Sequence, residues 1–255
     1  MNIEKVPASH GLKWVVQGLV LLRRNFFVWV LFVLLLWALV FVSSRLPFAG
    51  LALAVLTPVF LGGLMIGARA VEKGDELEIT HLFAGFRTHT LNLLAVGAFY
   101  LVGNVVIVMI MGGIGGEAIE RIAAMQGQEM DPEALAKFVG PAMMALLVGM
   151  ALSVPLTMAV WFAPLLVVFQ DEKPAPALRQ SFGACLRNML PFFVYGLVIF
   201  VPLVLLMLPF NKMGVDRNPG LWIVALLVLP SIYTSYRDIF RDASGPEAPA
   251  ATPAS

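Results

Sequence analysis

Apolar residues occur along the chain in long, nearly uninterrupted runs, and polar residues gather between these runs. A helix needs about 20 consecutive apolar residues to cross the hydrocarbon core of a bilayer. The strands of a membrane barrel would alternate apolar and polar residues, which these runs do not do. The sequence therefore predicts six membrane-spanning helices, at about 26–42, 46–68, 91–116, 139–169, 190–210 and 221–236.

Two of the six segments depart from the simple pattern. The fourth is longer than a bilayer requires and contains Pro155 and Pro164, so we expect it to tilt or bend. The sixth is the shortest, and serine and threonine dilute its end. The predicted fold class is all-α, a polytopic membrane helix bundle in which residues 1–240 form a single domain. Residues 241–255 are small, polar and rich in proline, which predicts a disordered tail.

The first apolar run follows Arg23 and Arg24, and two interpretations compete for it. A cleavable signal has a short basic start, an apolar core of about 7–15 residues and a small-residue cleavage site. Here 25 residues precede the run, the run is 17 residues long, and another apolar segment follows it almost at once. We therefore predict a retained membrane span.

Short amphipathic segments precede the first, third and fifth predicted spans. In each, apolar residues fall at helical spacing and a basic residue directly follows the last of them, as in Leu22-Arg23, Phe86-Arg87 and Leu186-Arg187. Such helices lie in the membrane interface, with cations toward the lipid phosphates. The candidate contacts to lipid headgroups or a partner are Arg23, Arg24, Arg87, Arg179 and Arg187. A true threefold repeat of helix and hairpin, or a chance likeness of basic loops, are both open interpretations.

The amino-acid composition agrees with a membrane protein and excludes some other classes. Hydrophobic residues make up 60% of the chain, against about 45–50% in soluble domains, and charged residues make up 13%. The mean hydropathy is +0.88. A net charge of +1 gives no basis for a nucleic-acid partner. The single cysteine, Cys185, excludes an internal disulfide.

Lysine and arginine are distributed unevenly between the two sides of the predicted topology. With the N-terminus inside, twelve of them fall in inner segments and five in outer loops. Because basic loops are retained in the cytoplasm, we predict a multi-pass protein of the bacterial inner membrane with both termini cytoplasmic.

Three stretches carry a resemblance to a known family: LKWVVQGLVLLRRNFFVW at 12–29, ARAVEKGDELEITHLFAGF at 68–86 and DEKPAPALRQSFGACLRNMLPFFVYGL at 171–197. They resemble a family of uncharacterised bacterial inner-membrane proteins. That family is similar to the YciC type and to the membrane portion of glycerophosphoryl diester phosphodiesterases. The resemblance implies a polytopic fold and a membrane location. The phosphodiesterase domain, with its paired glutamates and metal site, has no counterpart here, so no catalytic residue is carried over.

The predicted spans offer little chemistry. Their cores contain no ionisable residue, which weighs against an ion-coupled transporter. The candidate intramembrane polar contacts are Asn104, Ser153 and Thr157. We expect Asn104 to bond to a neighbouring helix, and we expect the two hydroxyl groups to bond within their own helix beside Pro155.

The remaining polar residues give no motif for catalysis or metal binding. Three histidines lie on the predicted inner side without the spacing of metal ligands, and the carboxylates Glu72, Asp75, Glu76 and Glu78 suggest a solvated acidic turn. We therefore expect no enzymatic activity and no cofactor. The leading hypothesis is a protein that organises membrane lipids with anionic headgroups, or partner proteins, at the cytoplasmic leaflet. The alternative is a permease or lipid-handling channel with an uncharged pathway.

Overall fold

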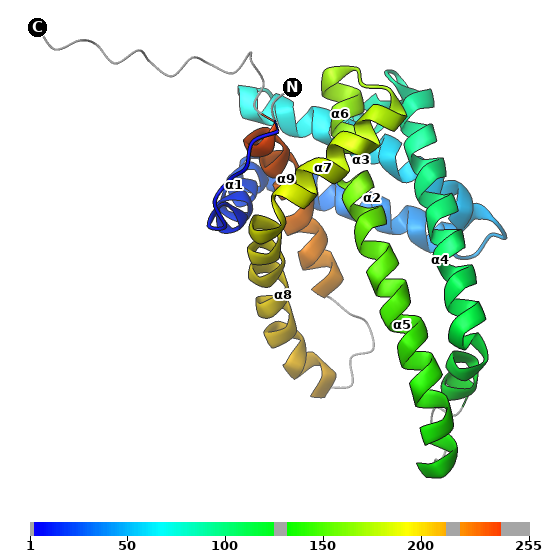
Figure 1. Cartoon of the computed structure of the whole chain (residues 1–255). Coiled ribbons are helices and arrows are strands. Elements are labelled where there is room, and N and C mark those ends of the chain that lie inside the picture. The colour runs from blue at the N-terminus through cyan, green and yellow to red at the C-terminus, as the bar shows by residue number, and fades with distance from the viewer. Residues whose placement is uncertain (1–2, 125–131, 213–219, 241–255) are drawn as a thin grey trace, which may run out of the picture. The chain divides into compact units, whose positions relative to one another are not determined.

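The computed structural model describes residues 3–124, 132–212 and 220–240, without the side chains of 132–136, 206–212 and 220–222. Every regular element in these residues is a helix (Figure 1). The elements are α1 (His10–Arg24), α2 (Phe26–Ser43), α3 (Ala49–Lys73), η1 (Ile79–Phe86), α4 (Thr90–Ala124), α5 (Pro132–Trp161), α6 (Ala163–Gln170), α7 (Pro174–Arg187), α8 (Met189–Lys212) and α9 (Gly220–Ile239).

The long helices coincide with the predicted apolar segments. Among the described residues, α2, α3, α4 and the Lys137–Gln170 stretch of α5 and α6 are long and apolar enough to cross a membrane. A fifth span results if α7 and α8, which bend by 79° at their junction, count as one broken span. The helical membrane fold is thus confirmed, and the count of six spans stays a prediction. The predicted tail at 241–255 lies outside the described residues.

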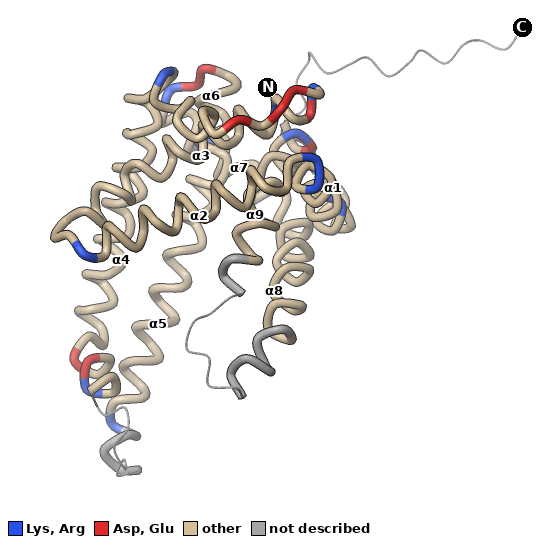
Figure 2. The backbone as a smooth tube through the Cα atoms, turned by 180° about the vertical axis from the view of Figure 1, so that it is seen from behind, with Lys and Arg blue, Asp and Glu red and all other residues tan. Residues whose placement is uncertain are grey.

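Charged residues lie at the ends of the long helices (Figure 2). Glu117, Glu120 and Arg121 stand in the last turns of α4, and Arg69 and Lys73 in the last turns of α3. Because a charge in the hydrocarbon core is costly, this distribution leaves the middle of each helix suited to lipid or to apolar packing.

The fourth predicted span is interrupted at Phe162, between α5 and α6, and Pro155 lies inside α5. Pro164 near the start of α6 lacks the N–H that would continue the helical ladder. Ser181 bridges a neighbouring pair of backbone groups, because its hydroxyl donates to the Met158 carbonyl (2.7 Å) and accepts from the Phe162 N–H (2.9 Å). Ser181 is fully buried. This serine of the resembling stretch at 171–197 therefore has a structural role.

Each amphipathic segment expected before an odd-numbered span is a short helix: α1, η1 and α7. The middle one is a 3₁₀ helix. A polar residue one or two positions after the last basic residue of each short helix segment marks a break in the helix. Asn25 separates α1 from α2, Asn188 separates α7 from α8, and His89 with φ of 59° precedes α4.

The chain groups into two compact units, each built from separate stretches. The first contains residues 1–38, 63–84 and 183–255, and the second contains 39–62 and 85–182. In the first unit, α1 packs against α8 and α9. A side chain at Gly11 would strike the backbone of α8 at Pro191, and one at Gly18 would approach Ser231 of α9 to 3.0 Å. The absence of side chains at these two positions allows the close approach.

The second unit is centred on the antiparallel pair α4 and α5. Gly97 of α4 lies directly against the Val55 carbonyl of α3, and Gly115 lies against the Pro141 carbonyl of α5. Gly112 and Gly116 have the four-residue spacing of small residues that is typical of close helix packing. Neither has an atom within 4 Å of an added Cβ. Gly115 makes that contact instead, because α4 kinks there, with φ of −157°.

We predict that Gly97→Ala destabilises the protein by about 1–3 kcal/mol, because the new methyl group collides with a backbone carbonyl that cannot rotate away. The matched control is Gly113→Ala on the same helix, where the added methyl meets open space and alanine favours the helix. Thermal unfolding of the purified chain in mild detergent measures both. Equal midpoints for the two variants would contradict the packing.

Candidate functional site

The five basic residues singled out by the sequence are all exposed. Arg23 and Arg24 end α1, Arg187 ends α7, Arg179 lies within α7, and Arg87 directly follows η1. Basic residues at helix C-termini also offset the negative end of the helix dipole. The structure therefore places all five cations on accessible surface, and four of them, Arg23, Arg24, Arg87 and Arg187, stand beside the breaks that lead into α2, α4 and α8.

Helix α1 has two apolar faces. One face is buried against the first unit and contains Trp14, Leu21 and Leu22 together with the close-packed glycines. Trp14 contacts the rings of Phe192 and Tyr195 of α8 at centroid distances of 5.1 and 6.1 Å. The other face carries an exposed apolar stripe, which we define as Leu12, Val16 and Val20. Large apolar side chains left exposed at helical spacing indicate contact with lipid or with a partner.

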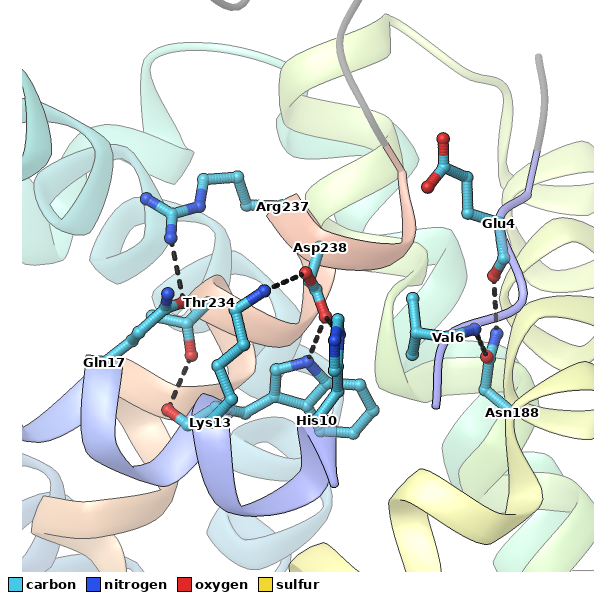
Figure 3. Close-up of polar contacts among 10 residues, drawn as sticks. Glu4, Val6, His10, Lys13, Gln17, Asn188, Thr234, Arg237 and Asp238 are labelled. Atoms are coloured by element: carbon cyan, nitrogen blue, oxygen red, sulfur yellow. Dashed lines mark hydrogen bonds and ion pairs between the residues drawn. The ribbon is translucent and has the colours of Figure 1, made fainter. Parts of the chain in front are cut away.

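Polar contacts fasten α1 to the end of α9 through one carboxylate, Asp238 (Figure 3). The indole N–H of Trp14 donates to Oδ2 of Asp238 (2.8 Å), and Lys13 donates to Oδ1 (3.0 Å). Nδ1 of His10 lies 2.6 Å from Oδ2. We call His10, Lys13, Trp14 and Asp238 the terminal clasp. It joins residues near the two ends of the sequence.

The Asp238 side chain is only 11% exposed, so its ionisation depends on these neighbours. Burial raises the pKa of the carboxyl, but hydrogen bonds from Trp14, Lys13 and His10 and the charge of Lys13 outweigh it. The net result is a pKa below the ordinary value. Asp238 therefore stays ionised at neutral and mildly acidic pH.

A second polar group lies next to the clasp in the same unit. Arg237 donates to the side chain of Gln17 (2.9 Å) and forms an ion pair with Glu72 of α3. The Tyr233 hydroxyl also donates to Glu72 (2.5 Å). Glu72 thus differs from Asp75, Glu76 and Glu78, which are exposed as the predicted acidic turn requires. Its paired position was not expected, because its partners lie about 160 residues away.

Asn188 anchors the N-terminal segment. Its side-chain carbonyl accepts from the Val6 N–H (2.9 Å), and its amide donates to the Glu4 carbonyl (3.0 Å) (Figure 3). The Glu4 N–H in turn donates to the Ile239 carbonyl at the end of α9 (3.0 Å). Asn188 is fully buried at the α7–α8 break. Its side chain supplies the hydrogen-bond partners of the Val6 N–H and the Glu4 carbonyl, as buried polar groups require.

A hairpin of long helices follows each break between a short and a long helix: α2 with α3, α4 with α5 and α6, and α8 with α9. Each break is linked to the end of its hairpin. Arg24 donates to the Val71 carbonyl near the end of α3 (3.1 Å), and His89 lies 3.2 Å from Asp171, which caps α6. The third link runs from Asn188 through Glu4 to Ile239. In all three cases the first helix of the pair therefore starts close to where the second ends.

The candidate intramembrane polar residues are satisfied locally where a bond is formed. The Asn104 amide donates to the Tyr100 carbonyl (2.8 Å), and the Ser153 hydroxyl donates to the Gly149 carbonyl (2.7 Å). The Asn104 bond therefore stays within α4, whereas the sequence favoured a bond to a neighbouring helix. The side chain of Thr157 is exposed on α5.

Other reactive groups do not form a second site in the described part of the chain. Cys185 is buried and unpaired in α7. No group of three or more histidine, cysteine or carboxylate side chains is arranged to hold a metal ion among the described residues. The residues that do form a network, centred on Asp238 and Asn188, carried no local sequence signal because their partners are over 180 residues distant.

Comparison with known proteins agrees with the membrane fold. The family described as a domain of unknown function, DUF7847, matches residues 11–236, from α1 into the last turns of α9. A probable inner membrane protein of Burkholderia thailandensis is 31% identical, and the match covers 98% of this chain and 97% of that relative. No solved structure matches the chain.

We predict that Asp238→Asn lowers the stability by about 1–3 kcal/mol at pH 7, because charge-assisted bonds from three donors are weakened. A carboxyl whose pKa is lowered on folding stabilises above its unfolded value of about 3.9, and this stabilisation is lost as pH falls through the folded pKa. The gap between wild type and variant should therefore narrow only below about pH 4.

Thermal unfolding midpoints in detergent across this pH range test the prediction. The control is Asp75→Asn, which removes an exposed carboxylate without a side-chain hydrogen bond or ion pair to the described residues and should change stability by less than about 0.5 kcal/mol. A constant gap between wild type and Asp238→Asn down to pH 3 would contradict the role of the ionised carboxylate.

Proposed function

The chain belongs to the DUF7847 family, and from this premise we propose that it is a multi-pass inner-membrane protein that organises lipids or partner proteins at the cytoplasmic leaflet. It does so without catalysing a reaction. Within this proposal it is related to the YciC type and to the membrane portion of glycerophosphoryl diester phosphodiesterases, as the three resembling stretches suggest.

One observation carries the proposal: exposed cations stand at the ends of short helices that also expose apolar side chains. On α1, Arg23 follows the stripe, and on α7, Arg187 follows the exposed Leu186. After η1, Arg87 follows the exposed Phe86. A helix with this pairing is suited to the boundary between acyl chains and anionic headgroups.

The hairpin links support a topology in which the chain returns three times to one side. A helix pair that ends where it began crosses the membrane twice, so three such pairs give six crossings. The bias of lysine and arginine assigns that side to the cytoplasm. Both termini are therefore cytoplasmic in this proposal.

The alternative of a permease with an uncharged pathway receives less support. A pathway needs polar groups free to face a passing solute, yet Asn104 and Ser153 are bonded to carbonyls of their own helices. Such bonds satisfy side chains surrounded by lipid or apolar neighbours. The proposal therefore keeps lipid organisation as the leading function.

The topology predicts opposite locations for two reporter positions. A reporter fused after Ser255 should be active on the cytoplasmic side, and one inserted at Gln128 should be active on the periplasmic side. At each position two reporters are compared, one that is active only in the cytoplasm and one that is active only in the periplasm. Activity of both on the same side would refute the three-hairpin arrangement.

The lipid role predicts that reversing Arg23, Arg87 and Arg187 to glutamate lowers the enrichment of anionic lipid around the protein several-fold. Each basic group near an anionic surface contributes about 1 kcal/mol to attraction. The measurement is the ratio of phosphatidylglycerol to phosphatidylethanolamine in polymer nanodiscs that contain the protein.

The matched control reverses three exposed basic residues of the predicted outer loops, Arg45, Arg121 and Lys137. It carries the same charge change and should leave the lipid ratio near that of the wild type. The proposal fails if both triple variants retain the wild-type ratio.

A further inference from the structure

We propose that the outward face of α1, together with the end of α3, binds one anionic phospholipid. Its headgroup lies between Arg23 and Lys73, and its acyl chain lies along the stripe of Leu12, Val16 and Val20. This inference rests on the proposed function and specifies a site for it. Lys73 enters only through the structure, because it lies 49 positions after Arg24 in the sequence.

The first step is that the ends of α1 and α3 are adjacent. The Arg24 guanidinium donates to the Val71 carbonyl (3.1 Å), which places the last turn of α1 at the last turn of α3. Helix α3 closes there with Gly74 in the left-handed region, and the N–H groups of Gly74 and Asp75 bond to the carbonyls of Val71 and Ala70. This cap fixes the end of α3 and satisfies its carbonyls.

The second step concerns the charges at that place. Arg23 and Lys73 are both exposed. Arg24 is held by the carbonyl, while neither Arg23 nor Lys73 has a hydrogen bond or ion pair to the described part of the chain. Two exposed cations on adjacent helix ends form a pair that suits one phosphate group.

The acidic groups in the neighbourhood limit where the phosphate sits. Glu72 is neutralised by Arg237 and bonded by Tyr233. Asp75 and Glu76 are exposed on the segment after Gly74. Their repulsion disfavours the side of Lys73 toward that segment, so the phosphate is favoured on the side of Arg23.

The third step is that Arg23 belongs to the same face as the stripe. Leu12, Val16, Val20 and Arg23 follow the spacing i, i+4, i+8 and i+11, which keeps them on one side of a helix. From the first to the last, this face extends about 16 Å at 1.5 Å per residue. An apolar track that ends in a cation matches a lipid, which has an acyl chain and an anionic end.

The exposed apolar stripe is not explained by packing of α1 within its own unit, because the opposite face of α1 makes that packing. That face is already buried against α8 and α9, with Trp14 and Leu21 in contact with the unit. The stripe therefore cannot be the packing face of α1 in this fold. Phe27, at the start of α2, is a further exposed apolar side chain (84% exposed).

The test uses the full chain purified in mild detergent and titrated with phosphatidylglycerol or phosphatidylcholine, with bound lipid counted by native mass spectrometry. Wild type should bind one phosphatidylglycerol at least about tenfold more tightly than phosphatidylcholine. The double variant Arg23→Gln and Lys73→Gln should lose this preference. Val16→Ser should weaken both lipids equally, because it alters only the apolar track.

The control is the double variant Arg45→Gln and Lys137→Gln, which removes two exposed cations elsewhere and should keep the preference. Glycerol phosphate in excess should not displace the bound lipid; displacement would mean that a free phosphate is the ligand and would overturn the lipid assignment. An equal loss in both double variants would overturn the site in favour of diffuse attraction, and no loss in either would overturn it as well. Thermal unfolding without lipid checks that each variant is folded.

The outcomes separate this inference from the proposed function. If the triple reversal lowers anionic enrichment in nanodiscs while Arg23→Gln and Lys73→Gln leave single-lipid binding unchanged, the function stands and the site falls. If neither experiment responds to charge, both fall.

Discussion

The ionised carboxylate of Asp238 determines how the first helix is held. A carboxylate so little exposed is stable only when donors replace its water, and here three donors from α1 do so. The bonds run between residues more than 220 positions apart, so they join the first and last helices of the described chain. With Trp14 fixed in this way, the rotation of α1 about its axis is set. That rotation decides which side chains face outward, and the exposed stripe follows from it.

The three hairpins show a shared solution to a second constraint. A chain that leaves a short helix and enters a long apolar one must interrupt its backbone ladder, and the interruption leaves polar groups without partners. Here the interruptions lie at or just before Asn25, His89 and Asn188. Arg24 and His89 contact the end of the returning helix directly, and Asn188 is linked to it through Glu4. The chemistry differs each time: a guanidinium on a carbonyl, an imidazole beside a carboxylate, and an amide on backbone groups. A true threefold repeat of short helix and hairpin stays a prediction, which the shared order of elements favours.

The sequence predicted what depends on neighbours in the chain. The long apolar helices follow from runs of apolar residues, and the short helices follow from apolar spacing ended by a basic residue. What it could not predict are contacts between distant segments. Glu72 looked like part of an acidic turn because its partner Arg237 is remote. The break at Phe162 also needs Ser181, 19 residues later, and Gly115 packs where Gly112 and Gly116 were expected because of a local kink in α4.

The terminal clasp also bears on the order of events during synthesis. Helix α1 leaves the ribosome before α9, because Asp238 lies 224 positions after Trp14. At about 5–20 residues per second, translation of the intervening chain takes roughly 11–45 s. During that interval the apolar face with Trp14 lacks its partner α9. An exposed apolar face of this kind tends to bind other apolar surfaces. An amphipathic helix is stabilised in the bilayer interface, so in the proposed topology the membrane would cover this apolar face until α9 is made.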